Sequence, residues 1–350
     1  MWLYIHQQPG WPYFEWDLNK LGEPLATIRY SQGMLRGRME AIGFPMRQEA
    51  VVQTLTQDVM KSSEIEGERL NAAQVRSSIG RRLGIDIGAL IPADRHVEGI
   101  VEMMLDATSH FDRPLTVERL YGWHAALFPT GRSGLAKISA GSWRKDRTRA
   151  MQVVSGPIGH EKVHFEAPAA KGLRREMKAF LEWFNDGDPM DPVLKAALAH
   201  LWFVTIHPFD DGNGRIARAI ADMTLARSEN STQRFYSMSA QIRRERAAYY
   251  GILEKTQKGG MDVTAWMDWF LGCLGRAISG AQTTLASVLY KAHFWDALAT
   301  VTLNDRQRLV LNRLIDGFEG KLTTSKYAKL AKCSQDTALR DIGHLTEQGI

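Results

Sequence analysis

Residues 191–218 read DPVLKAALAHLWFVTIHPFDDGNGRIAR, and this stretch decides the fold class. Its first part, residues 191–206, is apolar nearly all round, which is typical of a helix buried in the middle of a bundle. Pro208 ends that helix and leaves His207 at its boundary. A second helix is expected to begin near Gly214 and to continue through RIARAIADMTLAR. The stretch therefore predicts a helical bundle in which a polar loop follows a fully buried helix.

The loop and the start of the second helix combine groups that bind phosphates. Gly212-Asn213-Gly214 opens a helix, so several backbone N–H groups face one concavity with the positive end of the helix dipole behind them. Arg215 and Arg218 share one face of this helix, from which guanidinium groups can reach further along a polyphosphate chain. Taken singly, these features are more often an ordinary turn or an ion pair within a helix. Their combination predicts a polyphosphate site.

Three further side chains of the loop suggest chemistry or anchoring. Asp211 lies at the loop edge, where a carboxylate can hold Mg²⁺ that bridges phosphates. His207 stands at the rim, and a neutral imidazole can take a proton from an incoming hydroxyl, although a histidine at a helix end is more often a cap. Phe209 is apolar and is expected to anchor the loop in the core.

HPFDDGNGRIAR resembles the Fic signature, HxFx[DE]GNGRxxR, at every fixed position. The resemblance implies transfer of AMP from ATP to a Ser, Thr or Tyr hydroxyl of a target protein and of the chain itself, with release of pyrophosphate. It implies His207 as the general base, Asp211 as the ligand of Mg²⁺ (or Mn²⁺) and Phe209 as the buried anchor. The residues that would bind the nucleotide phosphates are Gly212, Asn213, Gly214, Arg215 and Arg218, with Arg218 on the γ-phosphate. A family variant that moves a phosphate lacks the glycine at position 212, so phosphotransfer is the weaker option, whereas UMP transfer stays open.

Residues 62–67 read SSEIEG and end a predicted helix, about residues 48–67. The helix has an apolar stripe through Val52, Leu55 and Val59 that continues onto Ser62 and Glu66. The helix dipole disfavours a carboxylate at this end, and burying one is costly without a cation. The pattern predicts a basic partner for Glu66, unless the helix rotates and the carboxylate lies in solvent. Glu64, on another face, is expected to be solvated.

The same six residues resemble [ST]xxxE[GN], the inhibitory motif of Fic proteins, with Ser62, Glu66 and Gly67 at its fixed positions. The resemblance implies that Glu66 pairs with Arg218 and obstructs productive placement of the γ-phosphate. ATP would then bind with its α-phosphate badly placed for attack. In some inhibited relatives the same glutamate positions water that removes AMP from the target, so a bifunctional AMPylase and de-AMPylase is an alternative.

Residues 151–166 differ from the helical remainder. MQVVS and KVHFE flank a Gly-Pro-Ile-Gly turn at 156–159 and predict a β-hairpin. The hairpin resembles the Fic flap, which clamps a target segment by main-chain pairing. GSWR at 141–144 resembles the segment that leads into the flap. Tyr249 and Tyr250 resemble aromatic residues that line the nucleotide pocket, with plain core packing as the alternative.

Composition sets broad limits. The 350 residues are 44% hydrophobic, enough for two or three packed units, and the net charge of +5 permits an anionic partner without requiring one. Cys273 and Cys333 are far apart and form no CxxC pair, so we expect reduced thiols in a cytoplasmic protein. No signal peptide, membrane span or tight zinc motif is evident in the sequence.

The C-terminal residues 303–350 resemble a winged helix-turn-helix that ends where a wing would start. Ser334 is expected to cap its recognition helix, with Leu339 facing inward and Arg340 outward. From Val301 onward there are eight Lys/Arg and six Asp/Glu, a weak excess for DNA binding. DNA binding through 303–350 therefore competes with a packing or dimerisation module, and relatives often form homodimers.

The expected architecture is all-α: a Fic helical bundle with a small β-hairpin flap, plus a C-terminal winged helix-turn-helix-like domain. We expect an N-terminal helical domain over 1–92, a Fic catalytic domain over 93–295 and a winged-helix-like domain over 296–350. The competing functional class is a DNA-binding regulator in which the Fic core only senses nucleotide. Helices outside the central stretch are expected over the ranges 18–41, 48–66, 71–83, 94–109 and 115–127.

Overall fold

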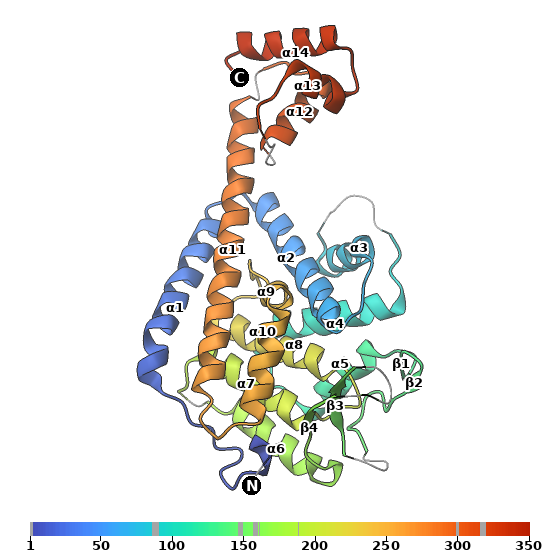
Figure 1. Ribbon diagram of the computed structural model, residues 1–350, viewed down its shortest axis with the longest axis vertical. Coiled ribbons are helices and arrows are strands. Elements are labelled where there is room, and N and C mark those ends of the chain that lie inside the picture. The colour runs from blue at the N-terminus through green and yellow to red at the C-terminus, as the bar shows by residue number, and fades with distance from the viewer. Residues whose placement is uncertain are drawn as a thin grey trace. The chain divides into compact units, whose positions relative to one another are not determined.

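The structure is a computed structural model that describes residues 3–85, 91–145, 150–156, 160, 162–187, 189–298, 301–315 and 320–350. Over these residues it has fourteen α-helices and two small two-stranded sheets, which confirms the all-α fold class (Figure 1). The chain divides into two compact units, residues 1–281 and 282–350, and each is described by itself. None of the described helices is both long and apolar enough to cross a bilayer.

The first helices of the larger unit bring the SSEIEG turn to the bundle. After a short 3-10 segment, η1 (Ile5–Gln7), come α1 (Leu18–Glu40), α2 (Phe44–Ile65) and α3 (Ala72–Leu83). α2 begins at Phe44, four residues before the expected start at residue 48. Gly43 caps the helix, and Pro45 occupies its first turn, where no N–H is needed. The stripe of α2 is buried as predicted, from Val52 at 0% exposed to Val59 at 1%.

The remaining helices of this unit surround the central pair. They are α4 (Arg95–Ser109), α5 (Val117–Leu127), α6 (Leu173–Asn185), α7 (Pro192–Ile206), α8 (Asn213–Glu229), α9 (Met238–Arg244), α10 (Arg246–Gln257) and α11 (Thr264–Ala297), which continues into the second unit. Every residue of α7 from Val193 to Ile206 is buried, as its all-round apolarity predicts. α2, α4, α6, α7 and α8 contribute to one hydrophobic core.

The β-hairpin consists of β3 (Gln152–Ser155) and β4 (Lys162–Glu166), paired antiparallel with an irregularity after Val153. Part of its expected turn, residues 157–159, lies outside the described residues. On the inner face, Phe165 is buried and packs edge-on against Tyr4, with ring centroids 5.1 Å apart. A second pair, β1 (Arg132–Ser133) with β2 (Ala136–Lys137), was not predicted, because two-residue strands leave no periodic signal.

A buried ion triad fastens α2 to the core. Arg234 Nη2 lies 2.9 Å from Asp58 Oδ2 on α2, and its Nη1 lies 2.7 Å from Asp222 Oδ1 on α8. Both carboxylates are at most 1% exposed. Burial raises the pKa of Asp222 to about 7 even though Arg234 opposes the shift. The arrangement makes the position of α2 depend on a cation inside the core.

We expect Arg234→Met to destabilise the fold by about 3–5 kcal/mol, because it leaves two carboxylates buried without their cation. The free energy of unfolding in urea measures the effect. Lys178→Met is the matched control, since the Lys178–Glu182 pair is exposed, 3.7 Å apart, and worth less than about 1 kcal/mol. Equal losses in the two variants would contradict a structural role for the triad.

The smaller unit contains α12 (Asp305–Ile315), α13 (Thr324–Ala331) and α14 (Gln335–Glu347), packed around Val310, Tyr327, Ala338 and Leu345. Ser334 caps α14 as predicted, its Oγ accepting from Thr337 N at 3.2 Å. No strand lies within the described part of 301–350, so these residues show no wing.

The expected inward position of Leu339 is wrong. Leu339 is 62% exposed, whereas Asp341 is only 6% exposed. Asp341 accepts hydrogen bonds from Arg306 Nε at 2.8 Å and from Tyr327 Oη at 3.1 Å. These partners offset the cost of burying the carboxylate and rotate the helix away from the face that apolarity alone predicts.

Candidate active site

The polar loop joins α7 to α8 through two left-handed residues. His207 caps α7 with φ at 53°, its N–H donating to Phe203 O at 3.0 Å. Gly212 caps α8 with φ at 78°, a conformation that favours glycine. A Cβ at Gly212 would also lie 2.9 Å from the Phe128 ring. The backbone therefore requires glycine at this turn, where α8 begins.

Side chains of the loop itself hold it rigid. Asn213 Nδ2 donates to Phe209 O at 2.9 Å, and Asn213 Oδ1 accepts from Phe209 N at 2.9 Å. Phe209 is 0% exposed and stacks on His124 with centroids 4.1 Å apart. Both polar atoms of the Asn213 side chain are therefore bonded within the loop. Only the backbone N–H of Asn213 remains for the predicted contact with phosphate.

His207 has the protonation state that a base needs. Its Nδ1 donates to Val204 O at 3.3 Å, which leaves Nε2 as an acceptor. Burial lowers the pKa of His207 to about 4, so the imidazole is neutral at physiological pH. Arg144, from the GSWR segment, donates from Nε to His207 O at 2.8 Å and fixes the backbone at this position.

The structure brings Glu66 and Arg218 together. Arg218 Nη2 lies 2.8 Å from Glu66 Oε1, and Arg218 Nε donates to Ser62 Oγ at 2.9 Å. Arg218 is 2% exposed, and its Nη2 also donates to Ser62 O at 2.9 Å. Gly67, with φ at 86°, lets the chain reverse after Glu66. A Cβ at Gly214 would overlap Glu66 Oε1, so the carboxylate lies against the N-terminus of α8.

A second carboxylate of the same turn, Glu68, was not predicted. Glu68 Oε2 lies 2.8 Å from Arg215 Nη1, and Glu68 Oε1 accepts from His96 Nε2. His96 Nδ1 faces Leu127 O at 3.2 Å, so both ring nitrogens point at acceptors. The hydrogen bond to Glu68 raises the pKa of His96; burial opposes that shift. Glu68 follows the helix and shares no periodic pattern with it, which is why the sequence gives no signal for it.

Two cavities meet this turn from different sides. One, of about 610 Å³, is lined by His207, Gly214, Tyr249, Tyr250 and flap residues, and the other, of about 590 Å³, by Asp211, Arg215, His96 and Phe128. Glu66 lines both of them. The turn therefore lies where a nucleotide that spans His207 and the arginines would have to pass.

Asp211 is the one predicted metal ligand. Its Oδ1 accepts from Gly212 N at 2.6 Å, and its Oδ2 accepts from Ser133 Oγ. Among the described residues, no group of three or more His, Cys, Asp or Glu side chains could hold a metal ion. A lone carboxylate suits Mg²⁺, which is commonly held by one or two carboxylates together with substrate phosphates.

The two tyrosines pack in the core and also line a cavity. Tyr249 is 2% exposed, and its hydroxyl hydrogen-bonds with His200 Nε2 at 2.9 Å, which is core packing. Tyr250 is less buried and lies under Arg246, whose guanidinium carbon is 5.0 Å from the ring centroid. Both also line the larger cavity.

Two stretches of the larger unit match known families. Residues 114–225 match the Fic/DOC family, and this range runs from α5 to the beginning of the last turn of α8 and contains the whole polar loop. The chain carries a Fic domain. Residues 4–85, with α1 to α3 and the SSEIEG turn, match a family described as a domain of unknown function, DUF4172.

Relatives of the Fic domain are similar at low identity. A protein adenylyltransferase Fic of Nematostella vectensis is 25% identical over 248 residues, 69% of this chain and 52% of that protein. The chain spans about half the length of the curated relatives it matches. Among solved structures, a Fic family protein from Desulfovibrio desulfuricans has a TM-score of 0.55 at 20% identity, covering 94% of this chain and 89% of that one. A Fic domain-containing protein from Bacteroides thetaiotaomicron has a TM-score of 0.54 at 19% identity, covering 74% and 97%.

Glu64, within the SSEIEG stretch, is less solvated than expected. It is 22% exposed, with Lys61 Nζ at 2.8 Å and Arg243 Nε at 3.6 Å. The prediction is wrong because α9 packs along α2 and brings Arg243 to that face. Glu64 lines neither of the two cavities that Glu66 lines.

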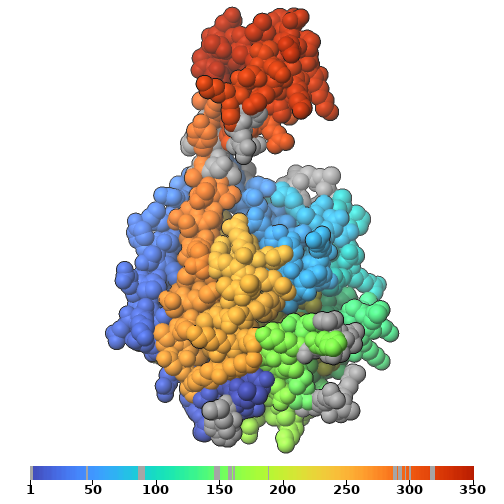
Figure 2. Space-filling model, viewed as in Figure 1, coloured from blue at the N-terminus to red at the C-terminus, as the bar shows by residue number. Residues whose placement is uncertain are grey.

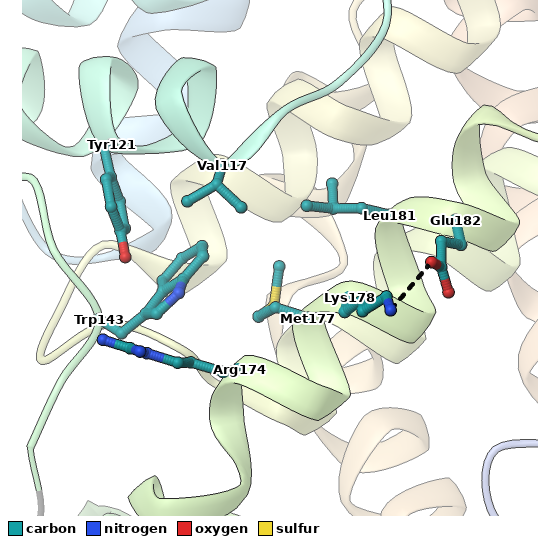
Figure 3. A pocket seen from close by; sticks show the side chains of 8 residues that line it. All are labelled: Val117, Tyr121, Trp143, Arg174, Met177, Lys178, Leu181 and Glu182. Atoms are coloured by element: carbon teal, nitrogen blue, oxygen red, sulfur yellow. Dashed lines mark ion pairs between the residues drawn. The ribbon is translucent and has the colours of Figure 1, made fainter.

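A third hollow of the Fic domain, of about 360 Å³, lies between α5 and α6 (Figure 3). Tyr121 and Trp143 form one wall, with ring centroids 4.6 Å apart, and Met177 and Leu181 of α6 form the other. Trp143 also packs on Phe209, with centroids 4.9 Å apart. Trp143 thus connects this hollow to Phe209, the buried residue of the polar loop.

Proposed function

We propose that the chain is a protein adenylyltransferase that moves AMP from ATP to a Ser, Thr or Tyr hydroxyl of a protein. The observation that carries the proposal is the shared cavity of His207 and Gly214, which combines a neutral imidazole with the N-terminus of a helix. The naming of the relatives as adenylyltransferases supports the same reaction. Incorporation of radiolabelled AMP from ATP, by purified protein with Mg²⁺, is the test.

In the proposed reaction the phosphates lie against the N–H groups of residues 213–215, because the Gly212 N–H already donates to Asp211 Oδ1. Arg215 and Arg218 lie further along the chain of phosphates. The target hydroxyl donates its proton to His207 Nε2 as its oxygen attacks the α-phosphorus. A new O–P bond forms, the bond from the α-phosphorus to the bridging oxygen breaks, and pyrophosphate leaves. Mg²⁺ held by Asp211 would neutralise phosphate charge.

The β3–β4 hairpin is proposed to hold the target. Val154 and Val163 are 46% and 38% exposed, which leaves apolar side chains on its outer face. An extended target segment can add to a hairpin edge by main-chain hydrogen bonds. That pairing would bring a side chain of the segment over the cavity that His207 lines.

We propose that the turn of residues 62–68 inhibits this reaction through two carboxylates. Glu66 forms an ion pair with Arg218, and Glu68 forms one with Arg215, each at 2.8 Å. A γ-phosphate and its neighbour would need the same guanidinium groups. Glu66 accounts for the misplacement of ATP that its motif implies, and Glu68 weakens binding of the phosphate chain in addition.

For the Glu66→Gly variant, we expect a further Glu68→Gln change to lower the KM for ATP by about tenfold. A hydrogen bond to a charged group contributes about 1.5–3 kcal/mol, and Arg215 would become available for phosphate. Steady-state AMP transfer against ATP concentration measures it. Glu64→Gln in the same background is the control and should leave KM unchanged. An unaltered KM in the Glu68 variant would show that Arg215 does not bind the nucleotide.

Two alternatives stay predictions with their own tests. Glu66 lines the cavity of His207, which supports a test of de-AMPylation: AMP-modified protein is incubated with Mg²⁺ or Mn²⁺ and release of AMP is measured. Release that does not depend on Glu66 would contradict it. Mobility shift with random DNA at low salt tests DNA binding by residues 303–350, and binding that is insensitive to salt would argue against phosphate contacts.

A further inference from the structure

A hydroxyl and an imidazole of the flap and a carboxylate of α10 form a hydrogen-bonded series. Ser155 Oγ on β3 lies 2.6 Å from His164 Nε2 on β4, and His164 Nδ1 lies 2.6 Å from Glu254 Oε2 on α10. Figure 2 shows α10 (yellow to orange) and the flap strands (green) meeting on one face of the molecule. None of the three belongs to the Fic signature or to the inhibitory turn. The geometry is that of a hydroxyl with its own base and a group that orients the base.

The protons of this series are assigned by its partners. A carboxylate can only accept, so His164 donates from Nδ1 to Glu254 and keeps Nε2 as an acceptor for the Ser155 O–H. Hydrogen bonds from Lys258 and from His164 lower the pKa of Glu254 to about 2, so it is ionised throughout the working pH range. Lys258 Nζ lies 2.6 Å from Glu254 Oε1, the oxygen that His164 does not use.

The series opens into the cavity of the proposed reaction. Ser155, His164 and Glu254 line the same space of about 610 Å³ as His207 and Gly214. Ser155 is exposed on its strand, so its hydroxyl is accessible from this space. The backbone of Ser155 already pairs with Lys162 between β3 and β4. Strand pairing alone therefore does not require an oriented imidazole beside the Ser155 hydroxyl.

We propose that Ser155 is an internal acceptor of the nucleotidyl group, with His164 as its base and Glu254 as the positioning residue. The inference rests on the proposed adenylyl transfer. Ser155 Oγ attacks the α-phosphorus of ATP, its proton passes to His164 Nε2, and the bond to the bridging oxygen breaks as pyrophosphate leaves. The product is a phosphodiester on the flap. Its bulk and negative charge lie beside the strand edge proposed for the target, so modification of Ser155 limits access of further targets.

The test uses the full chain with Glu66→Gly, incubated with ATP and Mg²⁺ and analysed by peptide mass spectrometry. We expect AMP on Ser155, at least a tenfold loss of that modified peptide with His164→Gln, and its complete loss with Ser155→Ala. Ser155→Thr keeps a hydroxyl and should carry AMP on the threonine. His110→Gln is the matched control for His164→Gln and should leave the modified peptide unchanged, because His110 is 44% exposed and lines neither cavity.

The outcomes separate this inference from the proposed function. AMP at other hydroxyls with none on Ser155 overturns the inference and leaves adenylyl transfer intact. No AMP on any protein hydroxyl means that the proposed function itself has failed. Modified Ser155 in undiminished amount with His164→Gln, or its loss with His207→Ala alone, overturns His164 as the base.

Discussion

His207→Ala is expected to abolish transfer of AMP to protein hydroxyls that depend on this histidine, with a loss of about 10²–10⁴-fold. The imidazole is neutral and its Nε2 is available as an acceptor because Nδ1 is committed to Val204 O. Alanine removes the acceptor and preserves the helix end. AMP incorporation by the Glu66→Gly chain with and without His207 measures the loss, with AMP on Ser155 counted separately.

The pH profile of the same reaction distinguishes the buried histidine from an ordinary one. A base must be unprotonated, so activity is retained above its pKa and lost below it. Since burial lowers the pKa of His207 to about 4, transfer should stay level from about pH 8 down to pH 6. A histidine with the usual pKa near 6.5 would already lose activity there.

His110→Ala is a control for the loss of a histidine, because His110 is 44% exposed and lines neither active-site cavity. A drop centred near pH 6.5, or unchanged transfer in His207→Ala, would contradict the role of His207.

Glu66→Gly is expected to raise AMP incorporation on the order of a hundredfold. An ångström of misplacement at the reacting centre costs about this much, and the Glu66 carboxylate lies against the N-terminus of α8, where phosphate would bind. Glycine removes the carboxylate and returns Arg218 to the nucleotide. Glu66→Gln should give a smaller gain, because the charge goes but the side chain remains.

The comparison has a clear negative outcome. Incorporation by Glu66→Gly equal to that of the unmodified sequence would show that the Glu66–Arg218 pair does not inhibit. Glu64→Gln again serves as the control, since Glu64 pairs with Lys61 and Arg243 and lines neither cavity. Equal unfolding midpoints for the variants would exclude a change in stability as the cause.

Strong local patterns made part of this molecule predictable. The all-round apolarity of residues 191–206 predicts α7 and its burial, and the stripe of α2 predicts that Glu66 needs a cation. These predictions work because each rests on a strong local pattern: apolar residues on every side of α7, and an apolar stripe at helical spacing on α2. The turn after α2 has no period, so Glu68 and its contacts with Arg215 and His96 could not be predicted.

Other misses come from partners distant in sequence. Leu339 lies outward because Asp341 finds Arg306 and Tyr327 in the neighbouring helices, and hydrophobicity alone cannot anticipate those hydrogen bonds. The series of Ser155, His164 and Glu254 joins residues up to 99 positions apart in a chain whose only local signal there is strand alternation. Such clusters become visible only when the fold has brought the elements together.

The ion triad of Asp58, Arg234 and Asp222 has a consequence for activation. α2 shares the hydrophobic core of α7 and α8, and the triad joins it to α8 through charges that have no access to solvent. Proteolysis or deletion of the N-terminal residues up to the turn would therefore remove a structural wall and produce misfolded chains instead of a released enzyme. Under the proposed inhibition, an activator would have to act on the few hydrogen bonds around Arg218 while α2 stays in place.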